Sequence, residues 1–274
     1  VTGIRVSHTD LDQLPGFAGD EDLIKSLQSV PGIKANGDGS SFFYVRGGHS
    51  DQNLILVDEA PIYNPSHLFG FFSAIAPDAL NSAHIYKGDF PARYGGRLSS
   101  VIDVKIKEGN MKRFGAAGSL GPYTTWLSFE GPISKEKCSF FLSARGSHVN
   151  WLLNPQKEDP VADIRFTDFN GKINYKISNN DRLYLSFFGG RDEYYSLESN
   201  PIKTFGINWR NNLSSFRWNH IFHDRLFSNT TAYYSVYNYT MDISKQENNY
   251  WRSSVGEVTI KSDFTWYPIP DHTI

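Results

Sequence analysis

Two short runs of polar residues in this chain combine side chains that enzymes use. His49, Ser50 and Asp51 are the residue types of a catalytic triad, but a triad is assembled in space from distant positions, and neighbours in one loop rarely form one. Asp58 and Glu59 could act as a carboxylate pair in acid–base chemistry. They follow an apolar run and precede a proline, so a tight turn is the simpler interpretation. We therefore expect that the protein is not an enzyme.

Residues that could hold a metal ion or a cofactor are equally sparse. The eight histidines are scattered, apart from His220 and His223 near a predicted turn, whereas metal sites need His or Cys at paired spacings. The single cysteine, Cys138, excludes an internal disulfide framework. Residues 36–40 resemble part of a calcium loop but lack its closing glutamate, so a glycine-rich turn is favoured. No phosphate loop or dinucleotide fingerprint is present, and the sequence predicts no metal and no cofactor.

The composition limits the class of protein. The chain has 274 residues and a formal net charge of −2, with no long run of like charges. Nothing therefore favours nucleic acid as a partner. No apolar run approaches the roughly 18 residues of a membrane-spanning helix. A strand of a transmembrane barrel needs only about 9–11 residues that alternate between apolar and polar, so a membrane location stays open.

Aromatic side chains divide the chain into two parts. Residues 1–110 contain 11 of them and residues 111–274 contain 30, including all six Trp. Trp and Tyr favour the interfaces of a membrane, but the aromatic core of a soluble β-sandwich would give the same composition. We therefore expect two domains, 1–110 and 111–274, and composition leaves both interpretations of the second one open.

The first part mixes short strands with one or two short helices. Residues 21–28 carry apolar side chains at helical spacing, with Asp20 as the expected N-cap. Residues 54–57 predict a strand buried on both faces. Residues 101–107 alternate apolar side chains with Asp and Lys, which predicts a half-exposed strand. A second short helix is expected to begin at Pro77, so this part is predicted to be a small α+β domain.

The second part is predicted to consist of consecutive β-strands. Residues 171–177 alternate apolar and polar side chains without exception, and residues 138–145 do so with Phe141 as the one exception. Polar clusters that suit short turns separate the strands, and longer segments such as 150–163 and 192–203 alternate with them. Short turns at one rim and long loops at the other are typical of outer-membrane barrels. At roughly 20 residues for a strand and its connection, about eight antiparallel strands are expected.

Four short motifs follow one another in the first part. They are Val30-Pro31-Gly32 at a helix end, Arg46-Gly47-Gly48 at a strand end, Asp58-Glu59-Ala60-Pro61 at a turn, and Arg93-Tyr94-Gly95-Gly96-Arg97 before the last strand. Each motif alone carries little information, but in this order and spacing they resemble the plug domain of a TonB-dependent outer-membrane receptor. One position departs from the family pattern, because Glu59 replaces a glycine and a positive φ there would be strained.

The resemblance implies a fold. In that family a small plug sits inside a large transmembrane β-barrel, and barrels with a plugged lumen have about 22 strands. The chain is therefore expected to be mainly β, with a small α+β plug domain followed by about eight antiparallel strands of an incomplete 22-stranded transmembrane β-barrel. The wall would be roughly the first third of such a barrel, and the end of the sequence, with its two prolines, is interpreted as a chain cut short.

The resemblance also implies a function and a location. The function is energised import of a scarce nutrient, a siderophore, vitamin or glycan, with the plug gating the barrel in the outer membrane of a Gram-negative bacterium. The implied partners are the nutrient, outer-membrane lipid and the TonB complex, which would pull on a segment that is not recognisable at the start of this chain. Residues 63–73 are similar to Bacteroidetes members of the family. A SusD-like lipoprotein partner is compatible with the sequence but not implied by it.

Particular residues are expected to matter if the resemblance holds. Plug–wall contacts in the family commonly join plug arginines to barrel glutamates, so Arg46, Arg93 or Arg97 is expected to meet Glu130 or a glutamate elsewhere in the wall. A solvated Glu130 is the alternative. The residues of the plug motif and of the expected plug–barrel contacts are Arg46, Gly47, Gly48, Asp58, Pro61, Arg93, Tyr94, Gly95, Gly96, Arg97 and Glu130. The plug loops expected to face the ligand carry Tyr63, Asn64, His67 and Phe69.

A second interpretation of the chain belongs to another class of protein. Residues 111–274 could form a soluble β-sandwich or a small barrel, which would be a binding or adhesion module with residues 1–110 as an accessory α+β domain. The two interpretations differ in where the apolar faces of the strands point. A sandwich buries them in a dry core, whereas a receptor wall turns them outward and points polar side chains toward the lumen.

Overall fold

The structure is a computed structural model that describes residues 3–11, 22–37, 40–150, 162–196, 205–244 and 249–268. The expected N-cap Asp20 lies outside the described residues, and so do the middle of the glycine-rich run 36–40 and most of the predicted long loops after residues 150 and 196.

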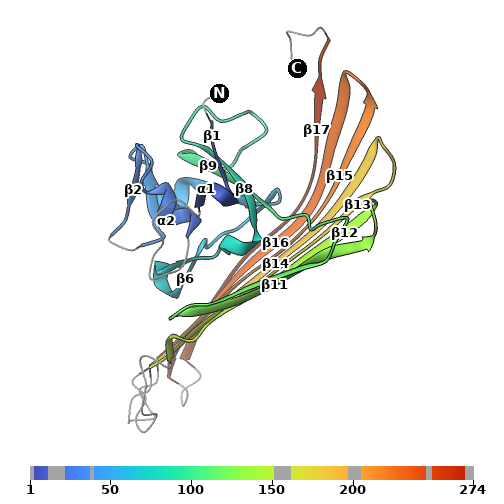
Figure 1. Ribbon diagram of the computed structural model, residues 1–274. Helices are drawn as coiled ribbons and strands as arrows, with labels where there is room; N and C mark the ends of the chain where they lie inside the picture. The colour runs from blue at the N-terminus through green and yellow to red at the C-terminus, as the bar shows by residue number, and fades with distance from the viewer. Residues whose placement is uncertain are drawn as a thin grey trace.

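The chain divides into an N-terminal unit of short elements and a sheet of long strands, which we call the wall sheet (Figure 1). The N-terminal unit consists of β1 (Gly3–Ser7), α1 (His8–Leu11), α2 (Leu23–Leu27), β2 (Ile33–Ala35), β3 (Phe43–Val45), η1 (Ser50–Gln52), β4 (Asn53–Val57), β5 (Ala60–Pro61), β6 (Ser66–His67), η2 (Leu68–Gly70), β7 (Phe72–Ser73), η3 (Pro77–Ala79), β8 (Leu80–Tyr86) and β9 (Ser100–Ile106). The wall sheet consists of β10 (Gly115–Leu120), β11 (Thr124–Ser134), β12 (Cys138–Ser147), β13 (Ala162–Lys176), β14 (Asp181–Ser196), β15 (Gly206–His223), β16 (Leu226–Ser244) and β17 (Asn249–Trp266).

The N-terminal unit is built on a five-stranded sheet in the order β1-β8-β9-β4-β5. Strands β4 and β9 are parallel and the other pairs are antiparallel. Helix α2 packs its apolar side chains into the core of this unit. Its N-cap is Asp22, whose carboxylate accepts the amide of Lys25 at 3.1 Å and that of Ser73 at 2.8 Å. One carboxylate therefore caps the helix and ties it to the β6–β7 hairpin.

Strand β9 differs from the prediction for residues 101–107. The alternation of apolar and charged side chains predicted a half-exposed strand, but nearly every residue of β9 is buried, including Asp103. The polar face is covered because Tyr94 donates its hydroxyl to Asp103 at 2.8 Å and Arg93 lies 3.7 Å from the same carboxylate. The predicted second helix does begin at Pro77, as a single 3-10 turn with proline in the first turn.

The wall sheet contains eight strands in sequence order, and each is antiparallel to its neighbours. This confirms the expected number of strands in the second part. The strands lengthen from 6 residues in β10 to 18 in β17. Short turns at residues 135–137, 177–180 and 224–225 connect alternate pairs of strands at one rim of the sheet, which we call the short-turn rim.

The two faces of the wall sheet have opposite chemistry. In β12 and β14 the side chains of Leu142, Leu185 and Phe187 are exposed, whereas those of Ser143 and Ser186 between them are buried. The polar face is therefore the covered one, and the apolar face is free. A soluble sandwich would bury the apolar face instead, so the interpretation of residues 111–274 as a sandwich is wrong. Among the described residues no helix is long and apolar enough to cross a lipid bilayer.

The N-terminal unit lies against one face of the wall sheet, as Figure 1 shows. Its hydrogen bonds with Ser143 and Ser186 identify this as the polar face. Apolar side chains interrupt that polar face at several points, among them Phe141, Phe188 and Leu213. These three belong to the same buried cluster as the apolar core of the N-terminal unit. Phe141 was the one exception to the predicted alternation, and it is apolar because the N-terminal unit covers it. The two parts therefore share one core and a polar interface around it.

Candidate functional site

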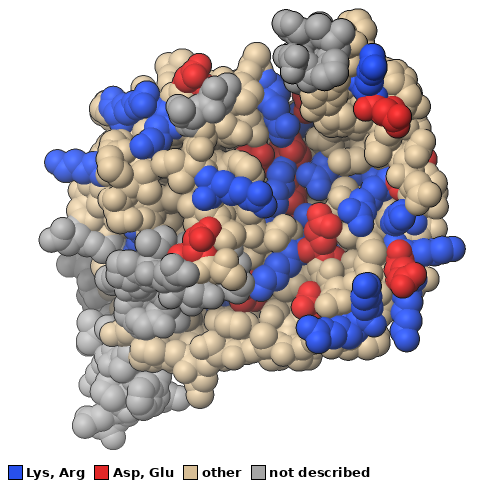
Figure 2. Space-filling model, turned by 45° about the horizontal axis from the view of Figure 1, so that its top comes forward, with Lys and Arg blue, Asp and Glu red and all other residues tan. Residues whose placement is uncertain are grey.

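The polar interface between the N-terminal unit and the wall sheet has two levels. The Asp58–Glu59 turn meets the wall beside Lys172, near the end of β13 at the short-turn rim. His67 meets Asp192, near the other end of β14. Figure 2 shows basic and acidic side chains mixed across the centre of this side of the molecule, with acidic groups recessed between basic ones.

The first level is organised by a strained turn. Leu56 pairs with Pro61 and Val57 with Ala60, so β4 and β5 form a hairpin with two central residues. Those residues have positive φ angles, 45° at Asp58 and 76° at Glu59. Positive φ at both positions is the signature of a type I′ turn, which favours Asn and Gly. A glutamate at the second position stores strain that surrounding contacts must offset, and the strain expected from the sequence at this turn is present.

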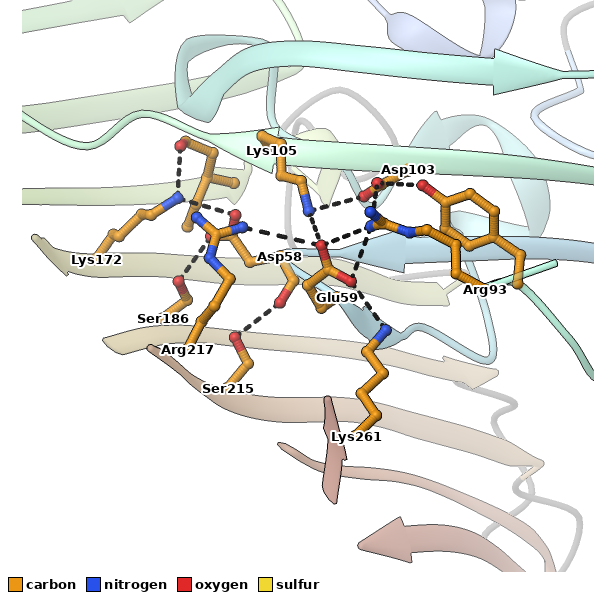
Figure 3. Close-up of polar contacts among 12 residues, drawn as sticks. Asp58, Glu59, Arg93, Asp103, Lys105, Lys172, Ser186, Ser215, Arg217 and Lys261 are labelled. Carbon is orange, nitrogen blue, oxygen red and sulfur yellow. Dashed lines mark hydrogen bonds and ion pairs between the residues drawn. The ribbon is translucent and has the colours of Figure 1, made fainter. Parts of the chain in front are cut away.

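The hydrogen bonds of the Asp58 carboxylate come from the wall. Its carboxylate is buried and accepts hydrogen bonds from Nζ of Lys172 at 2.9 Å and Oγ of Ser186 at 2.7 Å. Its backbone carbonyl accepts a third, from Oγ of Ser215 at 2.8 Å (Figure 3). Burial opposes ionisation, but the cations Lys172, Lys105 and Arg217 together outweigh it and hold the pKa of the Asp58 carboxyl below its ordinary value. Asp58 is therefore an anionic anchor on the wall.

Glu59 is shared between the N-terminal unit and the wall. Only 1% of its side chain is exposed, and its carboxylate lies 2.5 Å from Nζ of Lys105 and 3.1 Å from Arg93, both in the N-terminal unit. From the wall, Lys261 approaches to 2.9 Å and Arg217 to 3.9 Å. Figure 3 shows these cations arranged around the carboxylate. Burial would raise the pKa of Glu59, but the surrounding cations, Lys105 first among them, hold it well below its ordinary value.

The fourth motif joins the same cluster. The Tyr94 hydroxyl donates to Asp103, and the Arg93 guanidinium lies 4.8 Å from the centre of the Tyr94 ring. Burial, followed by the charge of Asp103, raises the pKa of the Tyr94 phenol above its ordinary value, so the hydroxyl stays a donor. Lys105 lies 3.1 Å from the other oxygen of Asp103. Motifs that are about 35 residues apart in sequence thus form one ionic network.

The second motif packs against the end of the fourth. A Cβ atom at Gly48 would lie 2.4 Å from Oγ of Ser99, so only glycine fits there. The Ser99 hydroxyl donates to the carbonyl of Val45 at 2.7 Å. Arg46 and Arg97 are exposed. Close packing therefore explains Gly48, whereas Gly47 has open space around it and a positive φ of 81° that favours glycine, and the two arginines lie at the surface.

The second level of the interface is centred on His67, of which only 2% is exposed. Its Nδ1 lies 2.7 Å from Asp192 and its Nε2 lies 3.2 Å from Asp168, so it bridges two wall strands. Its ring is stacked on Phe166, with centres 4.3 Å apart. Asp192 also accepts the backbone amide of Leu68 at 2.8 Å. Burial opposes the charged imidazole, but the charges and hydrogen bonds of Asp192 and Asp168 together outweigh it and raise the pKa of His67 above its ordinary value.

A known protein family matches the N-terminal unit. Residues 2–101 match the TonB-dependent Receptor Plug Domain. We therefore call the N-terminal unit the plug. No curated protein matches the sequence.

Solved structures of receptors and transporters share the fold. The siderophore receptor PirA from Acinetobacter baumannii superposes with a TM-score of 0.72 at 13% identity, over 96% of this chain and 45% of that chain. The outer membrane transporter YddB from Escherichia coli gives 0.70 at 11% identity, over 96% and 45%. BauA, the ferric preacinetobactin receptor from Acinetobacter baumannii, gives 0.65 at 11% identity, over 97% and 44%. The likeness at this identity is one of fold, and the chain spans less than half the length of these proteins.

The match to the plug family and the fold of these neighbours confirm two expectations. The protein is an outer-membrane protein, and it is not an enzyme, because residues 2–101 match the plug domain of TonB-dependent receptors. The Bacteroidetes assignment and the domain boundary at residue 110 stay predictions. Among the described residues, no group of three or more His, Cys, Asp or Glu is arranged to hold a metal ion.

At the first level the plug–wall ion pairs have the opposite polarity to the expected one. Among the ion pairs of the described residues none involves Glu130, and Arg93 pairs with Glu59 inside the plug. At the first level the plug supplies carboxylates and the wall supplies cations. Lys172 and Lys261 were visible in the sequence as charged positions on the polar faces of predicted strands, but nothing there named their partners. A contact of Arg46 or Arg97 with other parts of the wall stays a prediction.

Of the four residues expected to face a ligand, Phe69 is the one that the structure places at the surface. Phe69 is 50% exposed, whereas His67 is buried against the wall. Asn64 is partly buried, and its backbone carbonyl accepts Nδ2 of Asn211 at 2.8 Å. Tyr63 lines a cavity of about 220 Å³ between the plug and the wall, together with Arg97 and other residues of the fourth motif. These positions therefore divide between plug–wall contacts and one exposed aromatic side chain.

Proposed function

We propose that the protein is part of a TonB-dependent receptor that imports a nutrient across the outer membrane, with the plug gating the path through the wall. One observation carries the proposal. The plug is seated by buried ion pairs on the polar face of a sheet whose opposite face is apolar and free. An apolar outer face suits lipid, and a polar inner face suits a lumen that a plug must close. TonB and the nutrient are the partners of this proposal, and a SusD-like partner is not included in it.

We infer that the nutrient meets the plug at the loop that follows β6. Leu68 and Phe69 have positive φ angles of 48° and 59°, a conformation that costs energy for such residues. The strain presents Phe69 to solvent at the end of the wall opposite the short-turn rim. Its ring makes edge contacts with Trp209 at 5.1 Å and Tyr194 at 5.6 Å between centres. Three aromatic rings held in this way suit a ligand with apolar or ring-bearing surface.

Uptake by cells tests the proposal. A strain that lacks the gene would be complemented with the full-length protein, and uptake of labelled ferric siderophores, cobalamin and oligosaccharides would be measured with and without functional TonB. We expect TonB-dependent uptake of at least one of these nutrients. Phe69→Ala should raise the concentration for half-maximal uptake, whereas Leu98→Ala, at an exposed apolar residue of another plug loop, should not. Absence of TonB-dependent uptake of every nutrient would contradict the proposal.

A further inference from the structure

The hydrogen-bond geometry of His67 requires a particular protonation state. We propose that His67 is a positioning residue which, as a doubly protonated imidazolium, latches the Phe69 loop to the wall. The latch itself is inferred from contacts of the plug and the wall. Its consequence for the ligand rests on the proposed function, because that proposal makes Phe69 part of the ligand surface.

Both ring nitrogens of His67 face carboxylate oxygens. Nδ1 is 2.7 Å from Oδ2 of Asp192, and Nε2 is 3.2 Å from Oδ2 of Asp168. A neutral imidazole has one N–H, and an ionised carboxylate can only accept hydrogen bonds. A neutral ring would therefore direct the lone pair of one nitrogen at a carboxylate oxygen. Only the doubly protonated ring donates to both.

Asp168 is an ionised acceptor because of its other partner. The same oxygen that faces His67 accepts two hydrogen bonds from Arg145, from Nε at 2.8 Å and from Nη2 at 2.6 Å. A proton on this oxygen would compete with the guanidinium, so Asp168 cannot supply the missing donor. Arg145 also donates to the carbonyl of Ser73 in the plug at 2.6 Å. The proton in the His67–Asp168 contact therefore belongs to the imidazole.

Few other charged groups near His67 could balance the two wall carboxylates in place of the imidazolium. The charged groups that act on the ring are Asp168 on β13 and Asp192 on β14, and the guanidinium of Arg145 on β12 binds Asp168. The plug carboxyls Asp22 and Asp78 act on Arg145, and burial raises the pKa of both. The guanidinium and the imidazolium face the two wall carboxylates. Loss of the imidazolium proton would leave one negative charge without a partner in a buried site.

The same wall carboxylate holds the ring and the strained backbone. Asp192 accepts the ring N–H of His67 through one oxygen and the amide of Leu68 through the other, at 2.8 Å. Leu68 and Phe69 are the two residues other than glycine with positive φ in this loop. If the hydrogen bond between His67 and Asp192 weakens, Asp192 therefore holds the strained backbone at Leu68 and Phe69 less firmly. This connects the proton on His67 to the position of the exposed aromatic ring.

The latch has a defined dependence on pH. The pKa of His67 is raised in the folded protein, because Asp192 and Asp168 together outweigh the effect of burial. The stabilisation by the proton is therefore complete below the ordinary histidine pKa of about 6.5, and it is lost as pH rises through the folded pKa. Between the ordinary pKa and the raised pKa of His67, the equilibrium constant for opening of residues 66–73 should increase by up to about tenfold per pH unit. The reason is that opening of the loop then releases one proton.

Two measurements on the full-length protein in lipid nanodiscs test the latch. The first is the ¹⁵N shift of the ring nitrogens at pH 7, with His67 assigned by His67→Gln. Two protonated nitrogens are expected, and one protonated nitrogen with one unprotonated nitrogen would overturn the proposal.

The second measurement is hydrogen exchange of the loop amides between pH 6 and 9, corrected for the intrinsic rate. The wild type should lose protection as pH rises, and His67→Gln should show a flat profile.

A matched histidine supplies the control. His220 also lies 2.7 Å from an aspartate, Asp181, but this pair is partly exposed on the wall near the short-turn rim. His220→Gln should leave the exchange of the Phe69 loop and its pH profile unchanged. An identical pH profile in the wild type and His67→Gln would refute the latch. Neither measurement uses a nutrient, so the latch can fail while import holds, and import can fail while the latch is observed.

Discussion

Replacing Glu59 with glutamine tests whether its charge seats the plug. The carboxylate is buried and lies within 4 Å of four cations, two from the plug and two from the wall. Glutamine keeps the shape of the side chain and one hydrogen-bond acceptor, but it removes the negative charge. The cations would then repel one another across the interface without a counter-charge.

The magnitude follows from the burial of the partners. Removal of one member of a buried ion pair costs about 3–5 kcal/mol. Here the side chains of Lys105 and Lys261 are 20% and 24% exposed, so water can partly solvate them after the change. We therefore expect Glu59→Gln to cost about 3 kcal/mol, at the lower end of that range. In terms of local opening, this is roughly a hundredfold increase in the opening equilibrium constant.

A glycine at the same position separates charge from strain. Glu59→Gly also removes the carboxylate, but it relieves a φ of 76°, a conformation that costs a residue other than glycine on the order of 1 kcal/mol. We therefore expect Glu59→Gly to be less destabilising than Glu59→Gln by about 1 kcal/mol. This order would be unusual for a buried side chain, because glycine removes more contacts than glutamine does.

Native-state hydrogen exchange of the β4 amides is the suitable assay. All six Trp lie after residue 111, so Trp fluorescence reports on the wall rather than the plug, and a protein with two parts need not unfold in one step. Exchange measures the free energy of local opening directly. The control is Glu136, an exposed glutamate with a φ of 60° in the turn between β11 and β12. Glu136→Gln should be neutral, and an equal effect of the two Gln variants on β4 would refute the reasoning.

Three further predictions concern other parts of the interface and the wall. Lys172→Met should leave Asp58 buried without its cation and should cost about 3–5 kcal/mol, measured by exchange of the β4 and β5 amides. Gly48→Ala should cost about 1–3 kcal/mol through overpacking against Ser99, and Ser99→Gly should restore most of the loss in the double variant. Leu185→Arg, on the exposed apolar face, should cost up to about 2–4 kcal/mol in lipid but little in the docking of the plug, measured by urea titration of the protein in bilayers.

The strands and their faces were predictable because the signal is local. The alternation in residues 138–145 and 171–177 predicts which side chains share a face, and the structure confirms it for Leu142 and Ser143. A period of two does not say what covers each face. Phe141 therefore looked like an irregularity until the plug was seen to cover it, and β9 was expected to expose a polar face that is in fact buried.

The candidate site was predictable in its members but not in its pairing. The order of the motifs singled out Asp58, Arg93 and Tyr94, which do lie in one network. Their partners on the wall are far along the chain: Lys172 is 114 residues from Asp58 and Lys261 is 202 residues from Glu59. Two charges at that separation meet only because the wall sheet curves around the plug. A single sequence carries no direct trace of such a pairing, so the expected polarity of the interface was reversed.

The reversal of charge between the two levels explains why the plug docks on the wall sheet in one orientation. At the level of Asp58 and Glu59 the plug is anionic and the wall cationic, and at the level of His67 the plug is cationic and the wall anionic. A plug turned end for end would face like charges at both levels, each desolvated, and this arrangement is disfavoured by several kcal/mol. A slip of one residue in a wall strand would move Lys172 to the apolar face and leave Asp58 without a partner. The wall register and the plug orientation are therefore specified by the same buried charges.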